Sequence, residues 1–124
     1  MTNKEYADIL LPNVEKTFDD YKKIYPKRNL PKEAIVTRYA PSPTGYVHMG
    51  ALFSAFIASK MAKQTNGVFF LRSEDTDKKR EIADGVSGII RDLKNYGITI
   101  DEGMISETEW IGDYGPNIQS KRKD

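Results

Sequence analysis

The 124-residue sequence contains no cysteine and a single histidine, His48. The absence of cysteine excludes a disulfide framework and a zinc site built from thiolates. One histidine cannot form a histidine-rich metal centre or a relay of several histidines. We therefore expect no zinc and no protein-bound metal centre in this chain.

The sequence also lacks a charge excess of one sign and a long hydrophobic run. Nineteen basic residues against eighteen acidic ones give a net charge of +1, so any contact with RNA must come from local features. The longest apolar-rich run, ALFSAFIASKMA, is interrupted by Ser54, Ser59 and Lys60, and the first ten residues lack the apolar core of a signal peptide. These absences predict a cytoplasmic protein with no membrane partner.

Residues 1–33 differ in style from the rest of the chain, and we interpret them as an N-terminal extension. They are rich in charge and tyrosine and are interrupted by Pro26 and Pro31. Thr17, followed three residues later by Asp20, predicts the start of a short helix. We expect this extension to pack on the domain or to be partly mobile, and to carry no function.

Residues 34–124 form the predicted domain, which begins with regular elements. Residues 34–40 have high β-propensity and end at Pro41, and VFFLR at 68–72 is typical of a buried strand. A helix is predicted between them over residues 50–65, and Asn66-Gly67 is expected to end it with glycine in the left-handed conformation. The apolar residues that predict this helix by their three-to-four spacing are Leu52, Phe53, Phe56, Ile57 and Met61.

A second helix and a third strand come next. Tyr96-Gly97 closes the helix, ITID at 98–101 is the predicted strand, and the chain after Asp101 is expected to be loop. The apolar stripe of this helix consists of Ile82, Val86, Ile89, Ile90 and Leu93. The resulting β-α-β-α-β order predicts an α/β fold with a parallel sheet of the Rossmann nucleotide-binding type.

The stretch PSPTGYVHMG lies between the first strand and the first helix, where open parallel sheets bind ligands. Pro41 and Pro43 stiffen this turn, while His48 and Gly50 come at the helix entrance, where free amides favour an anion such as phosphate. A lone histidine near a helix start is more often a surface or capping residue. The residues alone therefore leave both a phosphate site and a plain strand-to-helix turn open, and the stretch matches neither the dinucleotide fingerprint nor the lysine-containing phosphate loop.

Four motifs together resemble a known family. RYAPSPTGYVHMGA, FFLRSEDTDKKR, YGITIDEG and YGPNIQSKR occur in the order and spacing of the opening third of bacterial glutamyl-tRNA synthetases, which are class I aminoacyl-tRNA synthetases. HMGA resembles the HIGH signature of that class, and PSPTG favours the glutamate enzymes over the glutamine enzymes. The resemblance covers residues 35–122 and implies that residues 34–124 are the N-terminal half of the Rossmann-type catalytic domain.

The resemblance implies an ATP site around the turn. ATP, accompanied by Mg²⁺, would contact Thr44, Gly45, His48 and Gly50, and His48 and Gly50 would serve the reaction itself. His48 would steady the phosphates while the glutamate carboxylate attacks the α-phosphorus, a transfer that depends on positioning and charge stabilisation.

The amino-acid side of the site is implied by four further residues. Arg38 would pair with the side-chain carboxylate of glutamate, Glu74 would hold its ammonium group, and Ala40 and Ser42 would line the pocket. Without the resemblance, Arg38 reads as a strand-end arginine in a surface ion pair. The acidic cluster at 74–77 reads as a magnesium site or, more simply, as a solvated loop.

The sequence departs from the family pattern at three positions and in its length. Ser73 occupies a position that is usually apolar, Asn117 stands where an aromatic residue is common, and Ala51 replaces the last histidine of the signature. The KMSKS-type loop and the anticodon-binding domain are also expected to be missing, so the chain would be a monomeric fragment that is inactive alone, with tRNA(Glu) as the partner of the full-length protein.

Two alternatives remain open: a non-catalytic ATP-binding or interaction module, and an enzyme like the glutamyl-queuosine tRNA synthetases.

Overall fold

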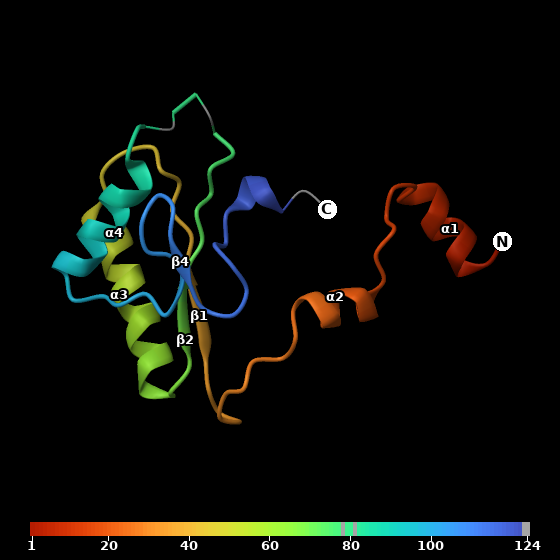
Figure 1. Ribbon diagram of the computed structural model, residues 1–124, viewed down its shortest axis with the longest axis horizontal. Coiled ribbons are helices and arrows are strands. Elements are labelled where there is room, and N and C mark those ends of the chain that lie inside the picture. Colours follow the sequence, from red (N-terminus) through yellow and green to blue (C-terminus); the bar gives the residue numbers. More distant parts are fainter. Residues whose placement is uncertain (78, 81, 123–124) are drawn as a thin grey trace.

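The computed structural model describes residues 1–77, 79–80 and 82–122, and its centre is a four-stranded sheet (Figure 1). The strands lie side by side in sequence order, with the first three parallel and the last antiparallel to its neighbour. They are β1 (Val36–Tyr39), β2 (Val68–Leu71), β3 (Glu102–Met104) and β4 (Trp110–Ile111). The predicted parallel α/β architecture is thereby confirmed.

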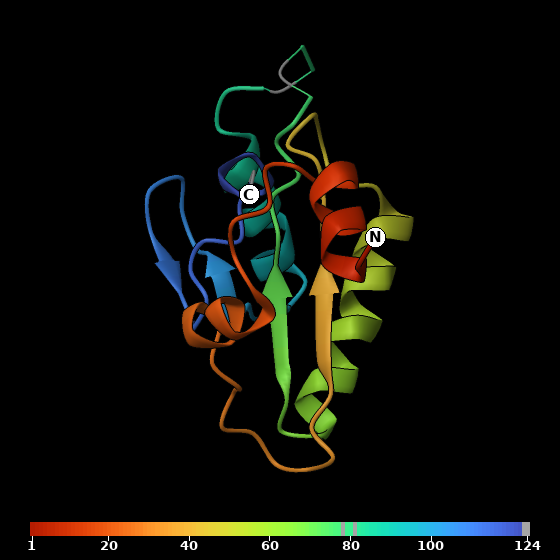
Figure 2. The same cartoon turned by 90° about the vertical axis from the view of Figure 1, so that its right-hand side faces the viewer.

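Two helices connect the parallel strands and cover the same face of the sheet (Figures 1 and 2). Helix α3 (Met49–Gln64) joins β1 to β2, and α4 (Gly85–Asn95) joins β2 to β3. The strands alternate between the two faces, so Phe69 and Leu71 of β2 are buried in the core on this side. The helices contribute most of the remaining core residues, namely Leu52, Ala55, Ala62, Ile89 and Leu93.

Helix α3 forms where the sequence predicts it, but its apolar stripe is not its buried face. Of the five stripe residues only Leu52 is buried, while Phe53 is 64% exposed. The side that meets the sheet carries Ala55 and Ala62, whose small side chains let the helix approach closely enough for the Thr37 hydroxyl to donate to the Ala58 carbonyl over 2.8 Å. Close packing therefore selects the small residues, and the large ones face outward.

Three predicted boundaries are wrong. Asn66, with φ of 52°, takes the left-handed conformation expected of Gly67; glycine is required next to it because a Cβ there would lie 1.9 Å from the Ile35 carbonyl oxygen. Ile82 precedes α4 instead of belonging to it. The third strand lies at 102–104 instead of 98–101, although Ile98 and Ile100 are buried in the core.

The segment after Asp101 also holds more structure than the sequence predicts. Strands β3 and β4 form an antiparallel pair, and a 3-10 helix, η1 (Gln119–Lys121), comes after them. Gly103 makes this possible, because its φ of 105° is left-handed and a Cβ would lie 2.2 Å from the Leu71 carbonyl oxygen. The sequence predicted a loop here because each of these elements is only two or three residues long, too short to show a periodic pattern.

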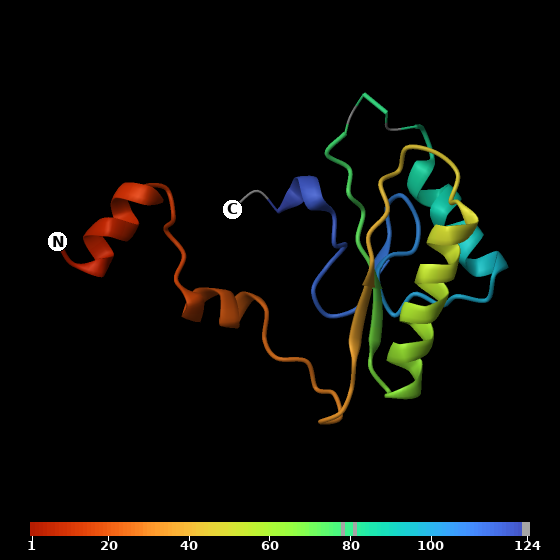
Figure 3. The ribbon, with the colours of Figure 1, turned by 180° about the vertical axis from the view of Figure 1, so that it is seen from behind.

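The extension contains two helices that lead away from the sheet (Figures 1 and 3). Helix α2 (Phe18–Ile24) begins with the predicted capping box of Thr17 and Asp20. Helix α1 (Asn3–Leu10) begins with a second capping box, Thr2 and Glu5, which was not predicted. No helix in the described part of the chain is long and apolar enough to cross a membrane.

Candidate active site

The PSPTG turn is fixed by contacts with the loop that precedes α4. Pro43 is fully buried, and its carbonyl oxygen accepts a hydrogen bond from the Ile82 amide over 3.0 Å. Gly85 packs so closely that a Cβ would lie 2.7 Å from the same oxygen. Within the turn, the Thr44 amide donates to the Ser42 carbonyl over 2.8 Å. Two connections that leave neighbouring strands therefore support one rigid turn.

His48 is the residue that precedes the first turn of α3. Its carbonyl accepts the Leu52 amide over 3.0 Å, but its side chain makes no capping hydrogen bond and is exposed. The first amides of a sixteen-residue helix are thus left without a side-chain cap, and the helix dipole adds partial positive charge there. This geometry suits an anion and matches the predicted helix entrance.

A cavity of about 510 Å³ opens between the turn and the helix, and we call it the turn cavity. Five of the predicted site residues line it, namely Ala40, Ser42, Thr44, Gly45 and His48. Gly50 lies outside this lining, in the first turn of α3, with open space where a Cβ would be. Tyr39 forms part of the wall, and burial, with a contribution from Asp92, raises the pKa of its hydroxyl.

Arg38 lies on the other face of the sheet. Because Thr37 and Tyr39 face the helices, the alternation of β1 directs Arg38 to the opposite side. It is exposed there and has no hydrogen-bond or ion-pair partner among the described residues. It lines a second cavity, of about 360 Å³, which we call the arginine cavity. The other residues of its lining are Arg28, Phe70, Arg72, Glu102, Tyr114, Asn117 and Arg122.

Glu74 lies where the two sides of the site meet. Its amide donates to the Pro41 carbonyl over 3.0 Å, which attaches it to the turn. Its carboxylate lies 4.0 Å from the Nε of Arg72, a residue of the arginine cavity. The structure therefore brings Arg38, Glu74 and the turn to the carboxyl ends of β1 and β2, while Arg38 and His48 open into different cavities.

The other acidic residues of the motif have partners of their own. Asp75 is buried and accepts both the amide and the hydroxyl of Ser120, which attaches the segment after β2 to η1. Asp77 accepts a hydrogen bond of 2.6 Å from Arg80, which lowers the pKa of that carboxyl. Lys78 of the same motif lies outside the described residues. These carboxylates build the loop, and no group of three or more His, Cys, Asp or Glu side chains that could hold a metal occurs among residues 1–77, 79–80 and 82–122.

The structure shows what Asn117 and Ser73, two of the departures from the family pattern, contact. Asn117 adopts a φ of 54°, a conformation that asparagine tolerates better than an aromatic residue does. Its amide is buried and donates to Glu102 over 3.2 Å. Ser73 is buried and exchanges backbone hydrogen bonds with the C-terminal segment, because its amide donates to the Asn117 carbonyl and its carbonyl accepts the Gln119 amide.

Sequence reasoning missed Glu102 and Arg28. Glu102 is 2% exposed and pairs with Arg28 of the extension at 2.8 Å. The two residues are 74 positions apart, and no local pattern signals such a contact. The only available signal is that Glu102 occurs within the YGITIDEG motif.

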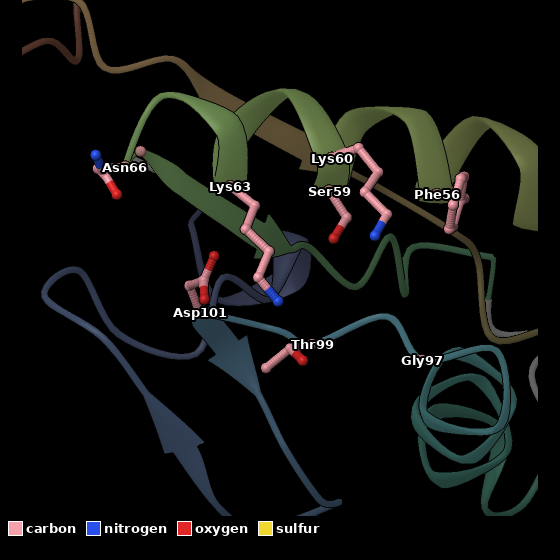
Figure 4. Close-up of a pocket in the computed structure, with 9 residues that line it drawn as sticks. Phe56, Ser59, Lys60, Lys63, Asn66, Gly97, Thr99 and Asp101 are labelled. Atoms are coloured by element: carbon pink, nitrogen blue, oxygen red, sulfur yellow. The ribbon is translucent and has the colours of Figure 1, made fainter.

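A further hollow, of about 380 Å³, lies at the opposite end of the sheet (Figure 4). Lys60 and Lys63 of α3 extend over it, facing Thr99 and Asp101 (Figure 4). It contains none of the predicted site residues, and it adjoins the beginnings of β2 and β3. Ligands of open parallel sheets bind at the other end, so we do not assign the site to this hollow.

Comparison with known proteins decides the family. The family model described as "tRNA synthetases class I (E and Q), catalytic domain" matches residues 34–124. The chain belongs to this family. Among its relatives, the glutamate–tRNA ligase of Clostridium beijerinckii is 47% identical over all 124 residues, and that of Clostridium perfringens (strain 13) is 43% identical. The predicted family is thereby confirmed.

Solved structures of the synthetase family have the same fold. The glutamate–tRNA synthetase of Elizabethkingia anophelis matches 73% of the chain with a TM-score of 0.64 and 36% identity. A glutamate–tRNA ligase from Elizabethkingia meningosepticum, solved in complex with its amino acid, matches the same share with a TM-score of 0.62 and 37% identity. The chain spans only 22% and 23% of the two clostridial relatives and 17% of each solved chain. The chain therefore corresponds to about a fifth of these longer proteins.

Proposed function

We propose that the chain supplies the first half of an active site that activates glutamate with ATP and transfers it to the 3′ end of tRNA(Glu). The observation that carries this proposal is the meeting of the turn cavity, Arg38 and Glu74 at the carboxyl ends of neighbouring parallel strands. Family membership and the glutamate-specific names of the relatives support it. The full reaction belongs to the longer proteins of which this chain covers about a fifth.

In the activation step, the α-carboxylate of glutamate attacks the α-phosphorus of ATP and pyrophosphate leaves. A bond from carboxylate oxygen to phosphorus forms as the bond to the bridging oxygen of pyrophosphate breaks. The exposed imidazole of His48 and the uncapped amides of α3 would stabilise the negative charge of the phosphates. A hydroxyl of the terminal adenosine then attacks the carbonyl carbon, and AMP leaves.

ATP would bind beside Thr44, Gly45, His48 and Gly50, as the family resemblance implies. None of the described residues that line the turn cavity carries a carboxylate, so a magnesium ion there would be held by the phosphates and by water. This agrees with a metal that arrives with ATP instead of residing in the protein.

On the amino-acid side, Arg38 would bind the side-chain carboxylate of glutamate. Its planar guanidinium suits two-point recognition of a carboxylate, and it has no competing partner among the described residues. Glu74, half-buried beside the turn, would accept the ammonium group, and Ala40 and Ser42 would shape the wall between.

Complementation tests the proposal. The chain would be combined with the remainder of the C. beijerinckii ligase, and charging of tRNA(Glu) would be measured for the unmodified chain, His48→Ala and Arg38→Ala. We expect charging by the unmodified pair and a fall of roughly 100-fold for His48→Ala, the size seen when one charge-stabilising donor is removed. Arg91→Ala, an exposed residue of α4, is the matched control. Unchanged rates for both site variants would overturn the assigned roles.

A further inference from the structure

Arg28 enters the arginine cavity from the N-terminal extension. Its Nη2 lies 2.8 Å from the Oε1 of Glu102, and the two side chains are only 18% and 3% exposed. Its guanidinium stacks 4.2 Å from the ring centre of Tyr114. A residue of the extension is therefore one of the best-fixed side chains of this cavity.

The segment that carries Arg28 is held by the C-terminal part of the chain. The Tyr114 hydroxyl donates to the Pro26 carbonyl, and the rings of Tyr25 and Tyr114 meet edge to face with centres 5.8 Å apart. The guanidinium of Arg122 lies 5.0 Å from the ring centre of Tyr25. Residues 25–28 are thus attached to the domain, whereas α1 and α2 lead away from it (Figure 3).

The position of Glu102 relative to Arg38 gives Arg28 its significance. Phe70 pairs in register with Arg38 on one side and with Glu102 on the other. Arg38 and Glu102 are therefore two strands apart on one face of the sheet, roughly 10 Å between Cα atoms, within reach of each other's side chains. The guanidinium of Arg28 lies 6.0 Å from the Phe70 ring centre, over the residue that separates them.

Among the described residues, Glu102 is the only carboxylate in the lining of the arginine cavity, which also contains four arginines. A buried carboxylate needs a cation beside it, and Arg38, two strands away on the same face, is one of the arginines of the cavity that could take the place of Arg28. As the structure stands, Arg28 and the Asn117 amide occupy Glu102, and Arg38 stays without a partner among the described residues. The Nε of Arg28 is buried without a partner among the described residues, so the ion pair with Glu102 is its main polar contact.

We propose that Arg28 is a positioning residue for glutamate recognition: by neutralising Glu102, it keeps Arg38 available to the substrate carboxylate. This inference rests on the proposed function. The extension would thereby take part in substrate binding, although the sequence predicts no function for it. Without Arg28, Glu102 would repel the incoming carboxylate and pair with Arg38 in its place.

Removal of Glu102 should therefore rescue the loss of Arg28. The chain and its variants would be titrated calorimetrically with a non-hydrolysable sulfamoyl mimic of glutamyl-adenylate. We expect Arg28→Ala to bind about tenfold more weakly, and the double variant Arg28→Ala/Glu102→Gln to return to within about threefold of the unmodified chain. Lys22→Ala, which removes an exposed cation of the same extension, should bind as the unmodified chain does.

The outcomes separate the two proposals. Unchanged binding by Arg28→Ala, or a double variant as weak as the single one, would overturn the role of Arg28 while leaving the proposed function intact. A double variant that binds well despite a lowered melting temperature would support the role, because packing alone cannot restore affinity. If the unmodified chain fails to bind the mimic even when it is combined with the remainder of the C. beijerinckii ligase, the proposed function fails and this inference fails with it.

Discussion

The two faces of the sheet differ in character, although the same three parallel strands form both: one face is apolar and packed, and the other is charged and open. On the helix-covered face, Phe69 and Leu71 pack with Leu93 in an apolar core. On the opposite face, their neighbours Phe70 and Arg72 line the arginine cavity, whose described lining also includes Arg28, Arg38, Arg122 and the buried carboxylate of Glu102. The period-two alternation of a strand thus assigns each residue either to the apolar core or to the lining of the arginine cavity.

This difference predicts which substitutions change stability and which change ligand binding. The core face depends on close packing, so its residues should affect stability and leave ligand selectivity unchanged. The opposite face, which carries the arginine cavity and which we call the arginine face, owes its charge to which side chains are paired. Substitutions there should change ligand selectivity, and they should change stability only where they break a buried ion pair. Four substitutions test this division, from the largest expected effect to the smallest.

Leu93→Ala should have the largest effect on stability. Leu93 is 0% exposed, and removing a buried leucine side chain costs about 2–5 kcal/mol in free energy of unfolding. Phe53→Ala on α3 is the matched control, because that side chain is 64% exposed and should cost less than about 1 kcal/mol. Urea denaturation followed by circular dichroism measures both, and equal losses would contradict the assignment of the buried face.

Glu102→Ala should destabilise the arginine face by roughly 3 kcal/mol, because it leaves Arg28 partly buried without its carboxylate. Asp19→Ala breaks an exposed ion pair with Lys22 in the extension and should cost less than about 1 kcal/mol. The same denaturation assay applies. A loss for Glu102→Ala as small as that of the control would mean that the pair does not hold the extension to the sheet.

Arg38→Ala should leave stability nearly unchanged, since the side chain is exposed and unpaired among the described residues. It should weaken binding of a glutamyl-adenylate mimic by about 10- to 100-fold, the range for a lost hydrogen bond to a charged group. Arg38→Lys should recover only part of this affinity, because an ammonium cannot make the two-point contact. A loss of stability without a loss of affinity would place Arg38 with the core residues.

Tyr39 should give the smallest effect, visible only in alkali. Burial raises the pKa of its hydroxyl above that of the unfolded chain, so the folded state holds the proton more tightly. The contribution to stability is complete below about pH 10 and is lost as the pH rises through the folded pKa. Tyr39→Phe should show a shallower decline in melting temperature above pH 10, and an identical decline in both proteins would refute the burial effect.

Much of the fold could be predicted because its signals are local. The high β-propensity of residues 34–40, the capping box at Thr17 and the Tyr96-Gly97 helix end all act within a few residues, and each appears where expected. The burial of α3 could not be predicted in the same way. Its buried alanines are set by how closely the helix approaches β1, which is a tertiary property.

The candidate site likewise has a part that local sequence predicts and a part that depends on tertiary contacts. The turn residues from Ala40 to His48 are close in sequence, and their gathering around one cavity follows from a strand-turn-helix connection. The pairing of Arg28 with Glu102 joins residues 74 positions apart, and it depends on the β2–β3 register and on the short pair of strands after Asp101. Those strands were predicted as loop, so the cavity that they complete was not foreseen.

One measurement tests the central claim, that the arginine face selects a carboxylate, most directly. The chain would be titrated with two sulfamoyl adenylate mimics, one glutamyl and one glutaminyl, which have the same shape and differ in a single negative charge. We predict that the unmodified chain binds the glutamyl mimic at least about tenfold more tightly, and that Arg38→Ala binds both equally. Equal binding of the two mimics by the unmodified chain would contradict the account.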